Sequence, residues 1–299
     1  MNQPQDTKAS NDRLMRNATY ASVAVACTLI FIKVIAYVVT GSVALLSSLI
    51  DSCLDAIASI LNLLAVRHSL TPADEDHRFG HGKAEPLAGL GQAAFIIASS
   101  LFLIFQALNR LVEPRPVDHG MIGIVVTIIS LLLTIVLVRF QKHVVTKTGS
   151  LAVEADSIHY LSDIILNLSV IVALVCSAYL GWPTADPIFA LGIAAYIIYS
   201  AWTIVINAYN QLMDRELPEQ DRDTIITIAR QHPEVVSLHE LRTRTSGKDV
   251  FIQLHLEMNG EITLNVAHRI ADEVEEEIRQ AFPGADILIH QDPYDDTVK

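Results

Sequence analysis

Residues 45–66 read LLSSLIDSCLDAIASILNLLAV, and this stretch decides the fold class. A run of about 20 apolar residues is long enough to cross a hydrocarbon core of roughly 30 Å, and this stretch meets that length. It nevertheless carries two carboxylates, Asp51 and Asp55, near its middle. A charged side chain at the bilayer centre costs at least about 2.5 to 3.5 kcal/mol. The two aspartates therefore indicate a functional site inside a membrane helix.

Other stretches of similar apolar character lie in the first 212 residues of the 299-residue chain. The six expected spans cover residues 14–40, 42–66, 84–112, 117–140, 150–180 and 184–212. Hydrophobic residues make up 51% of the chain and charged residues 18%, a balance too apolar for an ordinary soluble domain. The sequence therefore predicts an α-helical membrane protein with six transmembrane helices in a lipid bilayer.

The distribution of lysine and arginine predicts the orientation, because these residues accumulate in cytoplasmic segments. One set of segments outside the spans or at their ends holds Lys8, Arg13, Arg16, Arg67, Arg78, Lys83, Arg139, Lys142 and Lys147. The opposite set holds only Arg110 and Arg115. We therefore expect both termini and the loops after the second and fourth spans to be cytoplasmic. The first 13 residues lack the features of a removable signal peptide, so the first span is expected to be kept.

From about Met213 the composition becomes that of a small soluble domain. Helices are expected over residues 221–231 and 263–282, and strands over residues 235–245, 249–258 and 285–290. Apolar and polar residues alternate in the second of these strands, which is typical of a strand with one buried face. The order α-β-β-α-β predicts a small cytoplasmic α+β domain with its helices on one face of the sheet.

The expected organisation has four parts. They are a polar cytoplasmic tail (1–13), a six-helix transport domain (14–212), a cytoplasmic metal-binding regulatory domain (213–292) and a C-terminal tail (293–299). The net charge of −12 comes largely from the C-terminal portion. An acidic, solvated helix face explains this charge, so we expect no nucleic acid among the partners.

An internal repeat connects the second and fifth spans. A shift of 108 residues, from Gly41 to Gly149, aligns GSVA with GSLA and also places Asp55 on Asp163. The two spans cross the membrane in opposite directions in the expected topology, so the repeat is an inverted one. Each polar pair begins ten residues after its glycine, about 15 Å along a helix. Both pairs are therefore expected near the bilayer midplane.

The two pairs together form a candidate metal site. Residues four apart share one helix face, so Asp51 and Asp55 point the same way, as do His159 and Asp163. Three carboxylates and one imidazole match the oxygen and nitrogen ligands of Zn²⁺ and similar divalent ions. The alternative is that the acids are protonated or paired with a base. Lys33 is the only lysine or arginine well inside an apolar span, and it cannot neutralise three acids.

Two further groups of polar residues have more than one interpretation. Glu154, Asp156 and Ser157, nearer the cytoplasmic end of the fifth span, either line an entry path or have no specific role. In the loop after the second span, His77 and His81 are four residues apart and Asp74 precedes His77 by three. This spacing can bind one ion even in a loop, but incidental histidines in a pliable, glycine-containing loop are the alternative.

Three motifs together resemble the cation diffusion facilitator family. They are D51-S-C-L-D55, H159-Y-L-S-D163 and D74-E-D-H77-R-F-G-H81-G-K83-A-E. The resemblance extends from the first span through the C-terminal domain, which in this family has a copper-chaperone-like α+β fold. It implies a homodimeric secondary transporter, not an enzyme, that exports divalent metal in exchange for protons. The four intramembrane residues would be the transport site, and the loop residues Asp74, His77 and His81 a second metal site.

The resemblance also implies a regulatory metal site in the C-terminal domain. Five residues would converge between two protomers as a binuclear zinc site: His239, His255, His268, His290 and Asp292. Zn²⁺ would thus be both the substrate and a structural or regulatory ion, with protons as the coupling ion. The connection QKHVVTKTGS between the fourth and fifth spans lacks the histidine-rich insert common in eukaryotic relatives, which favours a prokaryotic plasma (inner) membrane.

The transport hypothesis rests on the chemistry of the intramembrane ligands. Metal binding requires deprotonated ligands, whereas like charges close together take up protons when the ion leaves. Alternating access would then couple outward metal movement to inward proton movement. An intramembrane metalloenzyme is disfavoured because the HExxH pattern is absent, and a membrane-anchored sensor because the acids lie at matched depth. The sequence leaves Zn²⁺, Cd²⁺, Fe²⁺ and Mn²⁺ open, and histidine favours zinc.

Overall fold

The computed structural model describes residues 3–112, 121–180 and 185–294. They form two compact units, one of Ser10–Tyr209 and a C-terminal unit of residues 210–294 together with residues 3–9. The expected start of the fourth span, residues 117–120, lies outside the described residues, as do Arg115 and residues 295–299 of the expected tail.

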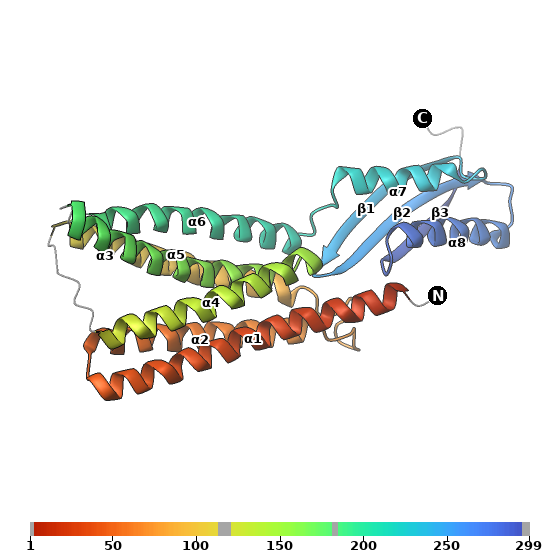
Figure 1. Ribbon diagram of the computed structural model, residues 1–299. Helices are drawn as coiled ribbons and strands as arrows, with labels where there is room; N and C mark the ends of the chain where they lie inside the picture. Colours follow the sequence, from red (N-terminus) through yellow and green to blue (C-terminus); the bar gives the residue numbers. More distant parts are fainter. Residues whose placement is uncertain (1–2, 113–120, 181–184, 295–299) are drawn as a thin grey trace. The chain divides into compact units, whose positions relative to one another are not determined.

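Long helices build the first unit and run beside one another (Figure 1). They are α1 (Gln3–Thr40), α2 (Val43–Ser69), α3 (Ala84–Val112), α4 (Met121–Thr148), α5 (Leu151–Leu180) and α6 (Ala185–Leu212). Helix α5 packs against α2, α3 and α4. Residues 3–13, which were expected to be a polar tail, are helical and continuous with the first span.

Within the described residues, five of these helices contain a segment long and apolar enough to cross a membrane. The segments are Ala9–Thr40, Leu45–Ser69, Ala84–Asn109, Ile122–Thr148 and Pro187–Leu212. Large apolar side chains on their outer faces are exposed, for example Phe31 and Val136. A soluble protein rarely exposes so many large apolar side chains together, so these surfaces are suited to contact lipid.

The turns before α2 and α5 have the same local structure. Gly41 and Gly149 have φ values of 61° and 64°, in the left-handed region that glycine adopts without steric cost. The N–H of each glycine donates at 2.8 Å to the carbonyl four residues earlier. The threonine before each glycine also bonds to the carbonyl four residues earlier, through its hydroxyl. The turns that the sequence alignment pairs are therefore built alike.

The C-terminal unit has the expected element order. Its elements are α7 (Glu219–Gln231), β1 (Ser237–Ser246), β2 (Asp249–Asn259), α8 (Leu264–Ala281) and β3 (Asp286–Tyr294). The sheet order is β1-β2-β3, with β1 antiparallel and β3 parallel to β2. The parallel pair needs a crossover connection, which α8 provides. Strand β3 runs past residue 290, where the sequence analysis ended it, and includes Asp292.

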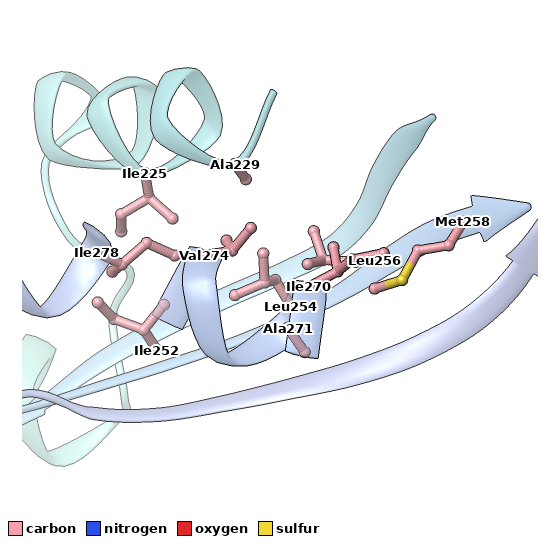
Figure 2. Close-up of a cluster of buried hydrophobic side chains, with 10 residues drawn as sticks. All are labelled: Ile225, Ala229, Ile252, Leu254, Leu256, Met258, Ile270, Ala271, Val274 and Ile278. Carbon is pink, nitrogen blue, oxygen red and sulfur yellow. The ribbon is translucent and has the colours of Figure 1, made fainter. Parts of the chain in front are cut away.

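The core of the C-terminal unit lies between the two helices and one face of β2 (Figure 2). Alternate residues of β2 enter it, from Ile252 to Met258, because successive side chains of a strand point to opposite faces. Residues of α7 and α8, such as Ile225 and Val274, cover them. Both helices therefore lie on one face of the sheet, and His255 belongs to the other face.

Candidate metal sites

The first candidate site joins α2 to α5 inside the helical unit. One ligand atom each of Asp55, His159 and Asp163 lies within 4.8 Å of the others. Nε2 of His159 and Oδ1 of Asp55 are 3.0 Å apart. The His159 side chain is 9% exposed and that of Asp55 22% exposed, so both are largely removed from solvent. Two carboxylates and an imidazole at this spacing can coordinate one divalent ion.

Two further contacts hold α2 and α5 together on the same side. The hydroxyls of Ser59 and Tyr160 are 2.9 Å apart, and Nδ2 of Asn62 donates to the carbonyl of Ala152 at 3.2 Å. As the residue number rises along α2 from 55 to 62, its partners fall along α5 from 159 to 152. The two helices are therefore antiparallel, which is the geometry that an inverted repeat requires. The sequence analysis did not single out these partners, although Asn62 is a polar residue in an apolar span.

Asp51, the fourth predicted ligand, lies outside the group of three. Its residue is exposed, whereas Asp55 one turn further along α2 is half-buried. Four residues along a helix correspond to about 6 Å, so the two carboxylates are displaced along the axis. In this structure α2 therefore contributes one ligand to the close group, and α5 contributes two.

Lys33 of α1 and Phe95 of α3 border this site. Nζ of Lys33 donates to the hydroxyl of Ser52 at 2.6 Å and to the carbonyl of Ser48 at 3.1 Å. The ammonium group is thus held on α2 at the residue next to Asp51. The ring of Phe95 lies edge-on to that of His159, with 5.9 Å between centroids. This contact restricts the orientation of the imidazole and was not foreseen from the sequence.

The entry-path interpretation of the three polar residues on α5 fits two of them. Glu154 and Ser157 line a cavity of about 330 Å³ between α4, α5 and α6, together with Lys142. Asp156 is not among the lining residues and is only 1% exposed. Its carboxylate is held by side chains of two other helices, so it does not line this cavity.

The second candidate site lies in the loop between α2 and α3. Ligand atoms of Asp74, His77 and His81 fall within 4.8 Å of one another. Asp74 is 3.4 Å from His77 and 3.3 Å from His81. The backbone N–H groups of His77 and Asp76 donate to Asp74 Oδ1, which keeps the pKa of that carboxyl below its ordinary value. The carboxylate is thus ionised and positioned before any ion arrives.

A further histidine, which the sequence analysis did not include, lies beside this loop. His68 is in the last turn of α2, and its ring centroid is 4.5 Å from that of His81. The centroid of the His77 ring lies 4.6 Å from that of the His81 ring. His68 is exposed, so its imidazole is free to turn. The signal in the sequence was its place at the end of the apolar span, nine residues before His77.

The third candidate site is a row of histidines across the sheet of the C-terminal unit. His239 of β1, His255 of β2 and His290 of β3 are paired in register. Asp292 binds all three, at 3.4 Å to His239, 2.8 Å to His255 and 3.1 Å to His290. The hydrogen bond from His255 holds the pKa of Asp292 below its ordinary value. The row lies on the sheet face that the helices leave uncovered.

A β-bulge in β1 lies next to His239, the first residue of the row. The register between β1 and β2 shifts between His239 and Arg242, and Glu240 has a φ of 48°. Bulges of this kind re-aim neighbouring side chains. Three of the five predicted residues, His239, His255 and Asp292, form a close ligand group, and His290 adjoins it.

His268 is the one of the five predicted residues that lies away from the row of histidines within a single chain. It is exposed on α8, and its nearest acidic partner is Asp272, at 3.5 Å, one turn along the helix. Helix α8 packs on the buried face of β2, whereas the row lies on the opposite face. The sheet itself therefore separates His268 from the other four residues within a chain.

Comparison with known families now identifies the class of protein. Residues 19–213 match the family described as the cation efflux transmembrane domain, and residues 217–294 match the cation efflux protein, cytoplasmic domain. The chain belongs to the cation efflux family, also called the cation diffusion facilitators. It is thus a multi-pass membrane transporter and not an enzyme, and the resemblance inferred from the three motifs is confirmed.

Individual relatives are similar over nearly the whole chain. The cation-efflux pump FieF of Klebsiella pneumoniae is 50% identical over 284 residues, which are 95% of this chain and 94% of that protein. FieF of Salmonella choleraesuis is 50% identical over 281 residues, 94% of this chain and 93% of that protein. A solved structure of CzrB, studied as a zinc transporter, is 32% identical, with 26% of this chain and 99% of that chain covered and a TM-score of 0.26.

Proposed function

We propose that the chain is a divalent metal cation/proton antiporter that exports Zn²⁺, and also Cd²⁺ or Fe²⁺, from the cytoplasm. The observation that carries this proposal is the group of Asp55, His159 and Asp163, which two antiparallel helices of an inverted repeat bring within 4.8 Å. Polar groups at the repeat interface, near the bilayer midplane, are typical of the substrate sites of secondary transporters. The imidazole among the ligands favours zinc over harder ions.

We assign α5 as the sixth transmembrane helix, in a domain of residues 14–212 followed by a cytoplasmic domain of residues 213–292. Its 30 residues are enough to cross the bilayer. Its polar residues His159 and Asp156 are buried among other helices, so they do not face lipid. The excess of lysine and arginine supports cytoplasmic termini, and similarity to bacterial pumps supports a prokaryotic inner membrane.

Asp51 completes the transport site in this proposal. A metal ion held by Asp55, His159 and Asp163 has one tetrahedral position left, and Asp51 lies one turn away on the same face of α2. Its exposed side chain has the freedom to rotate toward the ion. The ion's charge would offset the cost of bringing a third carboxylate into the group.

Protons are the coupling ion because the same ligands bind either metal or protons. A bound divalent ion displaces protons from the carboxylates and the imidazole. When the ion leaves, the mutual repulsion of the carboxylates favours the return of protons. If the site opens alternately to each side, metal leaves the cytoplasm as protons enter it.

The two cytoplasmic sites are regulatory in this proposal. In the loop, His68 adds a fourth ligand to Asp74, His77 and His81, giving the three-imidazole, one-carboxylate set that suits Zn²⁺. In the C-terminal unit, the open sheet face with its row of histidines is where a second copy of the chain would bind. His268, which is separated from the row by the sheet, would then serve the row of the other protomer in a homodimer.

Reconstituted vesicles test the proposal. Purified protein in sealed proteoliposomes, with a zinc-sensitive and a pH-sensitive dye inside, should move Zn²⁺ in one direction and protons in the other. Asp51→Ala should abolish zinc flux and its pH dependence, whereas Cys53→Ala, an exposed position between the two aspartates, should leave both unchanged. Normal flux and pH dependence in Asp51→Ala would refute the assignment of the site.

A further inference from the structure

A second polar cluster lies inside the helical unit and uses none of the metal ligands. Asp156 of α5 receives hydrogen bonds from Ser22 of α1 and Gln141 of α4. Both donate to the same atom, Oδ2, at 2.6 Å from the serine hydroxyl and 2.7 Å from the amide nitrogen. Nε2 of Gln141 also lies 2.9 Å from the Ser22 hydroxyl. The cluster thus joins three helices, and its members are at most 1% exposed.

Two oxygen atoms of this cluster have no hydrogen-bond donor among the described residues. They are Oδ1 of Asp156 and Oε1 of Gln141, and both are buried. The amide nitrogen of Gln141 faces two acceptors, Asp156 Oδ2 and the Ser22 hydroxyl, so its oxygen points away from both. A buried acceptor without a donor destabilises the fold, and does so more strongly when the acceptor is charged. Two such atoms, on two residues that are hydrogen-bonded to each other, require an explanation.

A single proton on Asp156 explains both atoms. A carboxylic acid and a primary amide form a cyclic pair in which the amide N–H donates to one carboxyl oxygen and the acid O–H donates to the amide oxygen. The first half of this pair is present, as the bond from Gln141 Nε2 to Asp156 Oδ2. Asp156 Oδ1 and Gln141 Oε1, the two atoms without donors, are the atoms that the second hydrogen bond of the pair would join. Protonation of Oδ1 turns it into the donor that Gln141 Oε1 needs, and it removes a buried charge.

We propose that Asp156 and Gln141 form a proton-binding site, separate from the metal ligands, that receives protons leaving the transport site for the cytoplasm. Asp156 lies three residues before His159 on α5, about 4.5 Å along the helix axis. In the proposed topology this displacement is toward the cytoplasm. A proton released inward from the transport site therefore meets this carboxyl next. The inference deepens the proposed antiport and rests on it.

The surroundings of Asp156 suit a group that alternates between two charge states. Among the described residues, the ionisable groups that interact with it include His159 and Tyr160 of its own helix and, more weakly than His159, Asp55 of α2. The side chains that touch it from α1 and α4, Ser22 and Gln141, are neutral. A metal ion or a proton arriving between Asp55 and His159 changes the field at Asp156. Occupation of the transport site would thus favour release of the proton to cytoplasmic water, and its emptying would favour uptake.

Asp156→Asn tests the pair directly, because the amide nitrogen can replace the protonated oxygen and donate to Gln141 Oε1. The full-length variant should fold and unfold thermally close to the unmodified protein. Its infrared spectrum should lose a carboxylic-acid C=O band that the unmodified protein shows. The matched control is Glu154→Gln, two residues earlier on α5, which removes an acid outside the cluster and should keep the band.

Each of these two measurements has a result that would refute the protonated Asp156–Gln141 pair. If a buried water molecule satisfies the two oxygens instead, Asp156 is ionised and the variant removes no acid band. If Asp156→Asn fails to fold, an amide cannot replace the group, and the protonated pair is again excluded.

The role in transport is tested in the same proteoliposomes. Asp156→Asn should transport Zn²⁺, but with a lower ratio of protons to zinc and a flatter pH dependence than the unmodified protein or Glu154→Gln. An unchanged ratio and pH dependence would refute the role in proton exchange. A failure of the antiport proposal is distinguishable from this, because the unmodified protein would then move zinc without protons while the infrared result would still report on the pair.

Discussion

Asp55→Asn is the substitution that most directly probes the geometry of the proposed transport site. Asp55 is the only residue of α2 in the close ligand group, so its loss leaves His159 and Asp163 on a single helix. The substitution preserves shape but removes a charge and the contact of 3.0 Å with His159. Loss of even an outer-shell partner of a metal ligand typically lowers metal affinity about 10- to 100-fold. Asp55 would be a direct ligand, so we expect zinc binding to be at least about 10-fold weaker.

The assay is the zinc concentration that gives half-maximal uptake into proteoliposomes. Cys53→Ala is the matched control on the same helix, and it should behave like the unmodified protein. Thermal unfolding of the detergent-solubilised variant checks that the fold is intact. A folded Asp55→Asn protein whose half-maximal zinc concentration stays within about two-fold of the unmodified value would refute the reasoning, because one ligand of three would then contribute less than a weak hydrogen bond.

The remaining predictions concern selectivity, the loop, the C-terminal unit and the repeated turn. His159→Asp replaces nitrogen with oxygen and should relax zinc preference toward Mn²⁺ in competition transport assays; unchanged selectivity would contradict this. His68→Ala should weaken zinc binding at the loop in calorimetric titrations, and equal affinity would exclude it as a ligand. A hydrogen bond from His232 lowers the pKa of Glu273, so Glu273→Gln should reduce thermal stability at neutral pH, and the difference should shrink as the pH falls through that lowered pKa; a pH-independent difference would count against it. Gly149→Ala forces alanine to a φ of 64° and should destabilise the protein by about 1 to 2 kcal/mol in thermal unfolding; an unchanged unfolding temperature would contradict this.

The local sequence pattern predicted the helices and strands, but it did not predict all of the residues at which they end. Alternation of apolar and polar residues predicted β2, because a strand with one buried face has a period of two. The end of β3 was placed too early, since the residues from 291 onward are polar and carry no apolar alternation; parallel pairing with β2 extends the strand to Tyr294. The polar start of α1 was predicted as a cytoplasmic tail without an assigned secondary structure, and the structure makes it helical, since polar residues are compatible with a helix that is exposed.

The candidate ligands came from residue type and spacing, and their grouping came from the fold. His68 was missed because its proximity to His81 depends on how the loop returns to the end of α2. For Asp156 the sequence left open an entry path or no specific role, because sequence alone does not show that Ser22 and Gln141, 134 and 15 residues away, reach it. His268 was grouped with the other histidines by resemblance, and the sheet separates it from them within one chain.

The sequence by itself determined the membrane class, the inverted repeat and the identity of the intramembrane acids, because hydrophobic length and four-residue spacing are properties of single helices. Only the tertiary structure decided that Asp55 rather than Asp51 meets His159, and that Asp156 shares its carboxylate with two other helices. Such contacts depend on the rotation and axial offset of one helix against another. Those are set by packing among residues far apart in the chain, and no local pattern encodes them.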